Sequence, residues 1–256
     1  MKLDSLLISN LINQKLKVIT YEEIDSTNNV CKTLGNSGDI NKLVISNYQT
    51  EGRGRLGRTF ISEKDKGIYM SLLIKPNISL TDVSKVTCVV ATSISKVLEK
   101  IINKKIDIKW VNDLYLNNKK VCGILTESSI IDNKINYLVI GIGINLYHQV
   151  FPKDIIASSI EDETGVLIKQ NELIGNITNQ ILEDIELINN KTHLEYYRKR
   201  LYLKEKLVEL NIRGEIFNGT IVDINDDFEL IVNIGGKEKI VTSGEIIKVK
   251  IKEEVI

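Results

Sequence analysis

Seven consecutive residues combine three glycines with three arginines, and their chemistry is that of anion binding. They run from Gly52 to Arg58 with the sequence GRGRLGR. Glycine allows positive φ and lets backbone N–H groups approach an anion, while each guanidinium offers a fork of donors that matches phosphate or carboxylate. The segment therefore predicts a loop that handles phosphate, and the alternative is a solvated basic turn.

The same loop fits the spacing G-x-G-x-x-G of dinucleotide-binding folds, but its surroundings do not. That fold needs a helix after the loop, and residues 59–67 are polar, charged and without helical periodicity. A Walker loop would end in Gly-Lys-Ser or Gly-Lys-Thr, which is missing here. Both nucleotide-binding folds are therefore disfavoured.

Further polar patches stand at strand ends or turns on either side of this loop. They are Ser26-Thr27-Asn28, Gln49, Lys109–Asp113 (KWVND), Lys120–Leu125 (KVCGIL) and Gly141–Asn145 (GIGIN). In this order the motifs resemble the biotin protein ligases, over nearly the whole chain from about residue 21. Two positions depart from the family pattern: Val111 stands where proline is usual, and Glu51 where a small residue is common. We expect Val111 to keep an extended backbone in a looser turn, with the site retained.

The resemblance implies an enzyme that activates biotin with ATP and Mg²⁺ as biotinyl-5′-AMP. It would transfer biotin to a lysine of the biotin carboxyl carrier protein of acetyl-CoA carboxylase or of another biotin-dependent carboxylase. We expect the monofunctional type, which lacks an N-terminal DNA-binding domain. The ureido ring of biotin would be held by Ser26, Thr27, Asn28 and Gln49, which all offer hydrogen-bond donors or acceptors. Helix capping is the alternative role for Ser26 and Thr27.

The resemblance also assigns the groups that surround the phosphate. Lys120 would reach the biotin carboxylate and the α-phosphate as the main catalytic residue, with Arg55 and Asp113 beside it. The loop residues that would fold over the acyl phosphate are Gly52, Arg53, Gly54, Arg55 and Arg58. Asn112 and Asp113 offer oxygen ligands, and Asp113 would serve either Mg²⁺ or the acceptor lysine.

The nucleotide would lie near an aromatic ring and several small residues. Phe60 falls where the family often places an aromatic that stacks on adenine, although an ordinary core position is the alternative. Gly141 and Gly143 would let the ligand or backbone approach closely, Gly123 and Gly143 would belong to the binding site, and Asn145 would contact adenine. A β-bulge without function is the alternative for the glycine strand. We expect Trp110 to be a packing anchor.

The elements that position these motifs follow from the hydrophobic periodicity. Helices are predicted at residues 4–14, 26–34, 79–102, 171–190 and 192–202, and strands at 17–22, 43–48, 67–75, 106–110, 115–116, 121–128 and 137–144. The fold class is α+β, with a mixed, largely antiparallel sheet packed by helices, as in the class II synthetase-like catalytic domain of the family. That domain would span residues 1–203, and residues 204–256 would form a small SH3-like β-barrel.

Composition restricts the other function classes. Thirty-four basic residues balance 34 acidic ones, so no global field favours nucleic acid or a membrane. We expect a cytoplasmic protein, because no apolar run approaches a membrane span and the first residues lack a signal-peptide pattern. Three cysteines without a CxxC pair and two histidines disfavour a zinc site or histidine catalysis. A lipoate or octanoate ligase of the same fold and a nucleic-acid-binding module remain as alternatives, and a homodimer joined at a sheet edge is compatible with the fold.

Overall fold

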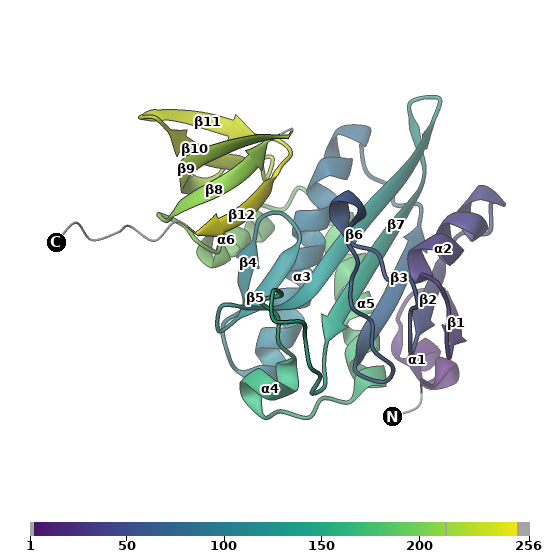
Figure 1. Cartoon of the computed structure of the whole chain (residues 1–256). Helices are drawn as coiled ribbons and strands as arrows, with labels where there is room; N and C mark the ends of the chain where they lie inside the picture. The colour runs from purple at the N-terminus through teal and green to yellow at the C-terminus, as the bar shows by residue number, and fades with distance from the viewer. Residues whose placement is uncertain (1–2, 213, 250–256) are drawn as a thin grey trace.

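The computed structural model describes residues 3–212 and 214–249, which form a larger and a smaller β-sheet (Figure 1). The larger sheet has seven strands in the order β1-β2-β3-β7-β6-β5-β4. Only β1 and β2 pair in parallel, and each of the other neighbouring pairs is antiparallel. The strands are β1 (Lys17–Tyr21), β2 (Lys42–Ser46), β3 (Gly67–Ile74), β4 (Asp107–Lys109), β5 (Asp113–Leu116), β6 (Lys119–Ile131) and β7 (Lys134–Asn145). The predicted mixed, largely antiparallel sheet is confirmed.

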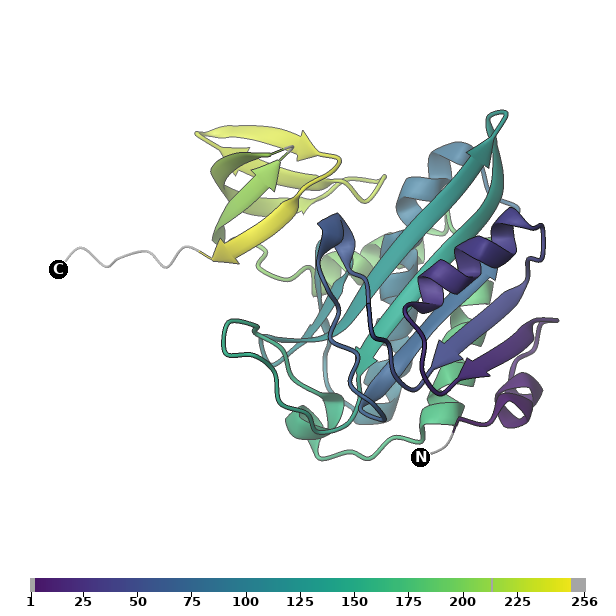
Figure 2. The same ribbon diagram turned by 45° about the vertical axis from the view of Figure 1, so that its right-hand side comes forward.

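Helices cover both faces of this sheet, with α2 on one side and α3 and α5 on the other (Figure 2). The α-helices are α1 (Ser5–Leu11), α2 (Thr27–Asn36), α3 (Val86–Ile102), α4 (Ile160–Thr164), α5 (Gln170–Glu186) and α6 (Lys191–Arg200). The predicted helix over residues 79–102 is divided, because the 3-10 turn η2 (Leu80–Lys85) precedes α3. Ser79 caps that turn by accepting a hydrogen bond from the backbone N–H of Asp82 at 3.2 Å. Helix α4 was not predicted.

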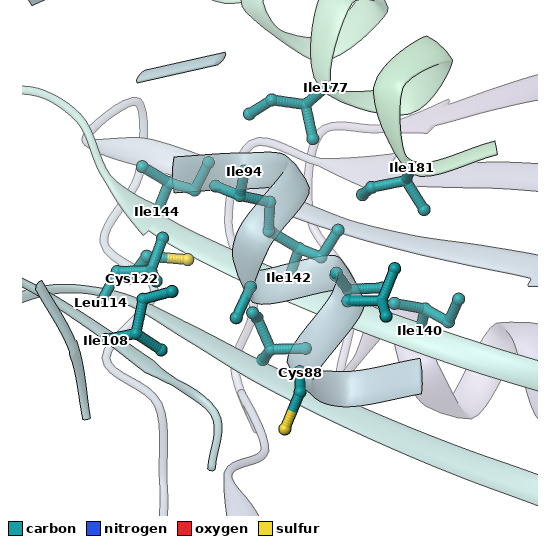
Figure 3. Packing of buried hydrophobic residues seen from close by; sticks show 14 of the residues in the cluster. Cys88, Ile94, Ile108, Leu114, Cys122, Ile140, Ile142, Ile144, Ile177 and Ile181 are labelled. Carbon is teal, nitrogen blue, oxygen red and sulfur yellow. The ribbon is translucent and has the colours of Figure 1, made fainter. Parts of the chain in front are cut away.

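The two faces of strand β7 carry different side chains because successive residues of a strand point to opposite sides. Ile140, Ile142 and Ile144 join the main core, where they face α3 and α5 (Figure 3). Residues 137 and 139 belong to a smaller cluster under α2, and Gly141 and Gly143 continue on that same face. On the α2 face, β7 therefore presents no side chains of its own where the glycines lie.

The C-terminal region forms a separate five-stranded sheet. Its strands are β8 (Leu207–Ile212), β9 (Glu215–Ile224), β10 (Leu230–Ile234), β11 (Lys237–Val241) and β12 (Glu245–Val249), in the order β11-β10-β9-β8-β12. All neighbouring pairs are antiparallel. Among the described residues the pairing runs from β11 to β12, so the second, antiparallel sheet expected at the C-terminus is present, and its form as an SH3-like barrel stays a prediction. The division at residues 203 and 204 lies between α6 and β8 and stays a prediction.

Two further features of the fold concern the cysteines and the length of the helices. Cys31, Cys88 and Cys122 are buried free thiols, and burial raises the pKa of Cys31 and of Cys88 to about 12. In the described part of the chain, no helix has the length and apolarity that a membrane crossing requires.

Candidate functional site

A cavity on the α2 face of the large sheet collects most of the residues that the sequence predicts as functional. The predicted residues that line it are Ser26, Thr27, Asn28, Gln49, Arg53, Gly54, Arg55, Arg58, Phe60, Asn112, Asp113, Lys120, Gly123 and Gly143. Gly52 and Asn145 do not line it. The lining also includes Gly141, where a close approach was predicted, and Lys109 and Glu245, which were not among the predicted site residues.

Glycines on β6 and β7 make room on the floor of this cavity. A Cβ atom on Gly143 would collide with the ring of Phe60, and one on Gly141 would collide with the side-chain amide of Asn28. A Cβ atom on Gly123 would lie 3.1 Å from Nζ of Lys120 and 3.2 Å from the Phe60 ring. The close approach expected at the glycine strand is therefore made by Phe60 and Asn28 themselves.

Ser26 stands at the N-cap position of α2, but its side chain makes no capping hydrogen bond. The capping interpretation is therefore wrong for Ser26. Gln49 supplies the missing acceptor, because the backbone N–H of Thr27 donates to Gln49 Oε1 at 2.8 Å. The hydroxyl of Thr27 lies 3.1 Å from the same oxygen, and Gln49 Nε2 donates to Ser62 Oγ at 2.9 Å. The start of α2 and Gln49 thus form one polar wall.

Asn28 is clamped between two strands behind that wall. Its Oδ1 lies 2.6 Å from the buried hydroxyl of Ser71 on β3, which also lies 2.7 Å from Thr27 Oγ1. Its Nδ2 donates to Glu127 Oε2 on β6 at 2.8 Å, and Glu127 is paired with Lys32 of α2. Ser71 and Glu127 escaped the sequence analysis because residues so distant along the chain give no local pattern.

The Gly/Arg loop lines the cavity and is held in shape by backbone hydrogen bonds. The 3-10 turn η1 (Arg55–Gly57) is closed by a hydrogen bond from the N–H of Gly54 to the carbonyl of Arg58 at 2.7 Å. Gly57 takes a φ of 74°, in the region that favours glycine. Gly52 serves this turn through its backbone, because its carbonyl accepts from the N–H of Phe60 at 2.9 Å.

Each arginine of the loop holds a different part of the chain. Arg53 donates to Asn29 Oδ1 on α2 at 2.8 Å. Arg55 donates to Asn112 Oδ1 at 3.1 Å and to the carbonyl of Gly244 at 3.3 Å. Arg58 forms an ion pair with Glu245 at the start of β12. The loop therefore links the large sheet to the C-terminal sheet.

Positive charge gathers at the end of the cavity near β4 and β6. Nζ of Lys120 lies 2.8 Å from Asp113 Oδ1 and 5.9 Å from the centroid of the Phe60 ring. Burial lowers the pKa of Lys109; Lys120 and Arg58 lower it further, whereas Asp113 and Glu245 oppose the shift. Lys109 was named only as part of its motif, and its partial burial in the cavity gives no signal in the sequence.

The turn after β4 contains the predicted oxygen ligands. The Trp110–Val111 peptide bond is cis. It lies in a turn, as was expected at this position, and Asn112 and Asp113 line the cavity. The extended backbone expected at Val111 stays a prediction. Trp110 is buried and donates Nε1–H to the carbonyl of Phe228 at 2.9 Å, which confirms a packing role. The side chain of Asn112 makes two hydrogen bonds. Its Oδ1 accepts from Arg55, and its Nδ2 donates to the carbonyl of Ile124 at 3.0 Å.

Asp113 fits a magnesium ion that arrives with phosphates. Its Oδ1 is buried and accepts no hydrogen bond of regular geometry, although Lys120 lies close to it. The described residues hold no group of three or more His, Cys, Asp or Glu side chains that could bind a metal. Mg²⁺ keeps several waters and is commonly bound by one or two carboxylates together with substrate phosphates, so one carboxylate in this cavity is a suitable donor.

Asn145 lies outside the cavity at the end of β7. It is buried, its Nδ2 donates to the carbonyl of Lys120 at 3.4 Å, and its Oδ1 has no hydrogen-bond partner. Its contact is therefore with the backbone of Lys120, and adenine contact stays a prediction.

Comparisons with known proteins agree with this geometry. Residues 20–145 match the Biotin/lipoate A/B protein ligase family. The bifunctional ligase/repressor BirA of Bacillus subtilis is 30% identical over 239 residues, which cover 90% of this chain and 73% of that protein. The biotin–[acetyl-CoA-carboxylase] ligase of Paracoccus denitrificans is 29% identical over 157 residues, which cover 59% of this chain and 65% of that protein. The structure of the biotin protein ligase from Aquifex aeolicus in complex with biotin and ATP superposes with a TM-score of 0.75 at 27% identity, covering 90% of this chain and 97% of that one. The chain therefore belongs to the biotin/lipoate A/B protein ligase family.

Proposed function

We propose that this protein is an ATP-dependent biotin–[acetyl-CoA-carboxylase] ligase. The observation that carries the proposal is the polarity of one cavity. At one end Thr27 and Gln49 present hydrogen-bonding groups, and at the other Lys109, Lys120 and the loop arginines present positive charge. Biotinyl-5′-AMP has the same two ends, a ureido ring that needs donors and acceptors and a phosphate that needs cations.

The first half-reaction joins biotin to AMP. A carboxylate oxygen of biotin attacks the α-phosphorus of ATP, a new O–P bond forms, and the bond to pyrophosphate breaks. Lys120 would lie beside both reacting groups and stabilise the negative charge that gathers as they meet. Mg²⁺ held by Asp113 and the phosphates would supply further charge neutralisation. The Gly/Arg loop would cover the mixed anhydride and exclude water with Arg53, Gly54, Arg55 and Arg58. The contacts that hold this loop against α2, Asn112 and Glu245 support this role.

The second half-reaction moves biotin to a protein. The amine of an acceptor lysine attacks the acyl carbon, an amide forms, AMP leaves, and the lysine nitrogen releases its proton. Asp113 would orient that amine once pyrophosphate has left. The acceptor is a biotin-carrying protein, and we propose the biotin carboxyl carrier protein of acetyl-CoA carboxylase as its identity.

Phe60 and its neighbours complete the proposed nucleotide site. The ring lies on Gly143 and below Lys120, so an adenine stacked on its exposed side would be close to the phosphate groups. Gly123 would leave room for the same ligand.

The experiment that tests the function is exchange of labelled pyrophosphate into ATP. We expect exchange that depends on biotin and is absent with lipoate or octanoate. Exchange with lipoate or octanoate and none with biotin would reassign the protein to lipoyl or octanoyl transfer. No exchange with any of the three acids would contradict the ligase proposal and favour a binding protein.

Two further assignments accompany the proposal. A cytoplasmic location agrees with three buried free thiols, because reducing compartments keep cysteines unpaired. We also propose a homodimer joined at a sheet edge, which sedimentation of the purified chain with and without biotin would test.

A further inference from the structure

The turn between β9 and β10 places an aromatic ring of the C-terminal sheet against the large-sheet region, next to α6 (Figure 1). Phe228 of this turn is 5% exposed, whereas Asp226 and Asp227 before it are exposed. Its ring meets the ring of Tyr197 on α6 edge to face, with the centroids 5.6 Å apart and the planes at 83°. Its carbonyl accepts the Nε1–H of Trp110 at 2.9 Å. Phe228 therefore contacts the large-sheet region with its side chain and with its backbone.

The backbone of Phe228 takes a conformation that favours glycine. Its φ is 60°, in the left-handed region, where a bulky residue is an outlier. Asn225 closes the turn, because its carbonyl accepts the N–H of Phe228 at 3.1 Å. Its side-chain oxygen also accepts the N–H groups of Asp227 and Glu229. A bulky side chain persists in such a conformation where its surroundings hold it, so the contacts of the ring outweigh the cost of the backbone.

Both partners of Phe228 hold the segment that we call the 110–113 turn, which carries the amide and the carboxylate at the phosphate end of the cavity. Trp110 is the first residue of this turn, and it lines the cavity. Tyr197 is fully buried, and its hydroxyl donates to the carbonyl of Val111 at 3.5 Å. Phe228 is therefore linked to the 110–113 turn through a ring contact on one side and a hydrogen bond on the other.

The C-terminal sheet reaches the 110–113 turn by a second route. The carbonyl of Gly244, directly before β12, accepts from Arg55, and Arg55 also donates to Asn112 Oδ1. The elements next to Phe228 and Gly244 belong to one sheet, because β9 pairs with β8 and β8 pairs with β12. The 110–113 turn is therefore held at two points by the same sheet.

We propose that Phe228 is a positioning residue for the reaction with ATP. Its ring, packed against Tyr197, keeps the 110–113 turn in place, so that Asn112 and Asp113 face the phosphates. Phe228 is not among the described residues that line the cavity, so it acts through this turn and not by touching the ligand. The inference rests on the proposed function, because the activation of biotin by ATP is the step that uses this end of the cavity.

The other end of the cavity should not depend on Phe228. The start of α2 and Gln49 form the wall proposed for the ureido ring, and their hydrogen bonds run to Ser62 and to Ser71 on β3. A change at Phe228 should therefore affect the use of ATP and spare the binding of biotin. A general loss of folding would affect both.

The test uses Trp110, the only tryptophan of the sequence, as a built-in probe of the contact. We expect Phe228→Ala to shift the fluorescence of Trp110 to longer wavelength, because water reaches the indole once the ring is lost. In pyrophosphate exchange with the full chain, the KM for ATP should rise about tenfold, within the range of coupling through packed side chains. The dissociation constant of biotin, measured by titration calorimetry, should stay unchanged.

Phe228→Leu separates the ring from the apolar volume. Leucine has the same difficulty as alanine with a φ of 60°, so a difference between the two variants reports the side chain and not the backbone. Leucine fills part of the space but lacks the ring edge, and the KM for ATP should rise about threefold. If Phe228→Ala failed to fold, Phe228→Leu would decide the question, because an unchanged KM for ATP and unchanged Trp110 emission in this variant would overturn the inference.

The matched control is Phe217→Ala, which removes a half-buried ring of the same sheet that lies under Nζ of Lys239 at 5.5 Å. This variant should leave the KM for ATP and the emission of Trp110 unchanged. The inference would be overturned by a folded Phe228→Ala protein that matches the unaltered protein in both quantities, and a lower Tm alone would then make Phe228 a purely structural residue. Equal losses of ATP and biotin binding would also overturn it. Absence of biotin-dependent exchange in the unaltered chain would instead contradict the proposed function, so the two failures are distinct.

Discussion

Lys119 and Lys120 are neighbours in the sequence, yet they lie in different surroundings. Lys120 lines the cavity, where it pairs with Asp113, whereas Lys119 is exposed and pairs with Glu163 at 2.8 Å. The two residues are therefore a natural pair for separating a catalytic charge from a surface charge.

We expect Lys120→Ala to lower biotin-dependent pyrophosphate exchange by on the order of 100-fold or more, because charge stabilisation at a reacting phosphate is lost. Lys119→Ala should change the exchange rate by less than about twofold, since Lys119 does not line the cavity. The rate of exchange is measured after circular dichroism has established that both variants fold. A folded Lys120→Ala protein with normal exchange would remove Lys120 from catalysis.

Gly143 offers a second test at the scale of single residues. Alanine there would place a Cβ atom into the ring of Phe60, and overpacking of this kind costs about 1–3 kcal/mol. We expect Gly143→Ala to lower the Tm, and Gly143→Ala/Phe60→Leu to recover part of the loss because the smaller side chain relieves the collision. Equal Tm values for the single and the double variant would mean that Phe60 does not rest on this glycine.

Residue types predicted the contents of the cavity better than they predicted individual contacts. Ser26, Gln49 and Lys120 were found because their chemistry stands in recognisable motifs, and all three line the cavity. Glu127 and Lys109 were missed because their importance comes from contacts with other elements of the fold, which leave no local pattern in the sequence. Asn145 does not line the cavity, since its side chain donates to the backbone of Lys120, and its predicted contact with adenine stays a prediction.

At the scale of elements, strand β7 was predictable because apolar residues alternate with glycine or small residues and point to opposite faces of the sheet. The boundary between η2 and α3 was not predictable in the same way. The sequence keeps helical spacing across it, and only the hydrogen bond from Asp82 to Ser79 marks the tighter turn. The short helix α4 was missed because five residues are too few to give a periodic pattern.

The packing of α3, α5 and α6 encloses a histidine whose titration affects stability. His193 on α6 is 2% exposed, its Nε2 has no hydrogen-bond partner, and its Nδ1 lies 3.4 Å from Nζ of Lys96. Burial lowers the pKa of His193, Asp184 opposes the shift, and Lys96 adds to it. The folded protein therefore binds a proton at this site less readily than the unfolded chain does.

The sign of the pH dependence follows from that difference. Above about pH 6.5, the usual pKa of histidine, His193 is neutral in both the folded and the unfolded protein, so the free energy of unfolding has its full value. As the pH falls below this value, the unfolded chain gains the proton first, and the free energy of unfolding decreases. We expect the Tm to fall between about pH 7 and pH 5, and His193→Gln to reduce that fall. His148→Gln, which alters the exposed histidine, is the control and should leave the fall unchanged. An identical fall in the His193→Gln protein would exclude His193 as its source.

At the scale of the whole molecule, the C-terminal sheet is a part of the site. Trp110 and Arg198 of the large-sheet region donate to backbone carbonyls of Phe228 and Ile224, which fixes the small sheet against the large one. Gly244 and Glu245 then reach the Gly/Arg loop from the start of β12. The sequence predicted the strands of this sheet, but it gave no indication of which edge faces the cavity, because that depends on contacts between distant residues.

The contact between Arg58 and Glu245 allows a test of this arrangement. We expect Glu245→Ala to free Arg58 and to leave the loop held mainly by Arg53 and Arg55, so that trypsin cleaves the loop faster while the Tm changes little. The rate of cleavage at residues 53–58 is measured by mass spectrometry on the full chain. Glu238→Ala on β11, at the opposite edge of the same sheet, removes an exposed carboxylate away from the loop and should not change the rate. If the Glu245→Ala protein were cleaved at the same rate as the unaltered protein, the ion pair would not restrain the loop. If cleavage became faster in Glu238→Ala as well, the effect would come from the whole C-terminal sheet and not from the contact between Glu245 and Arg58.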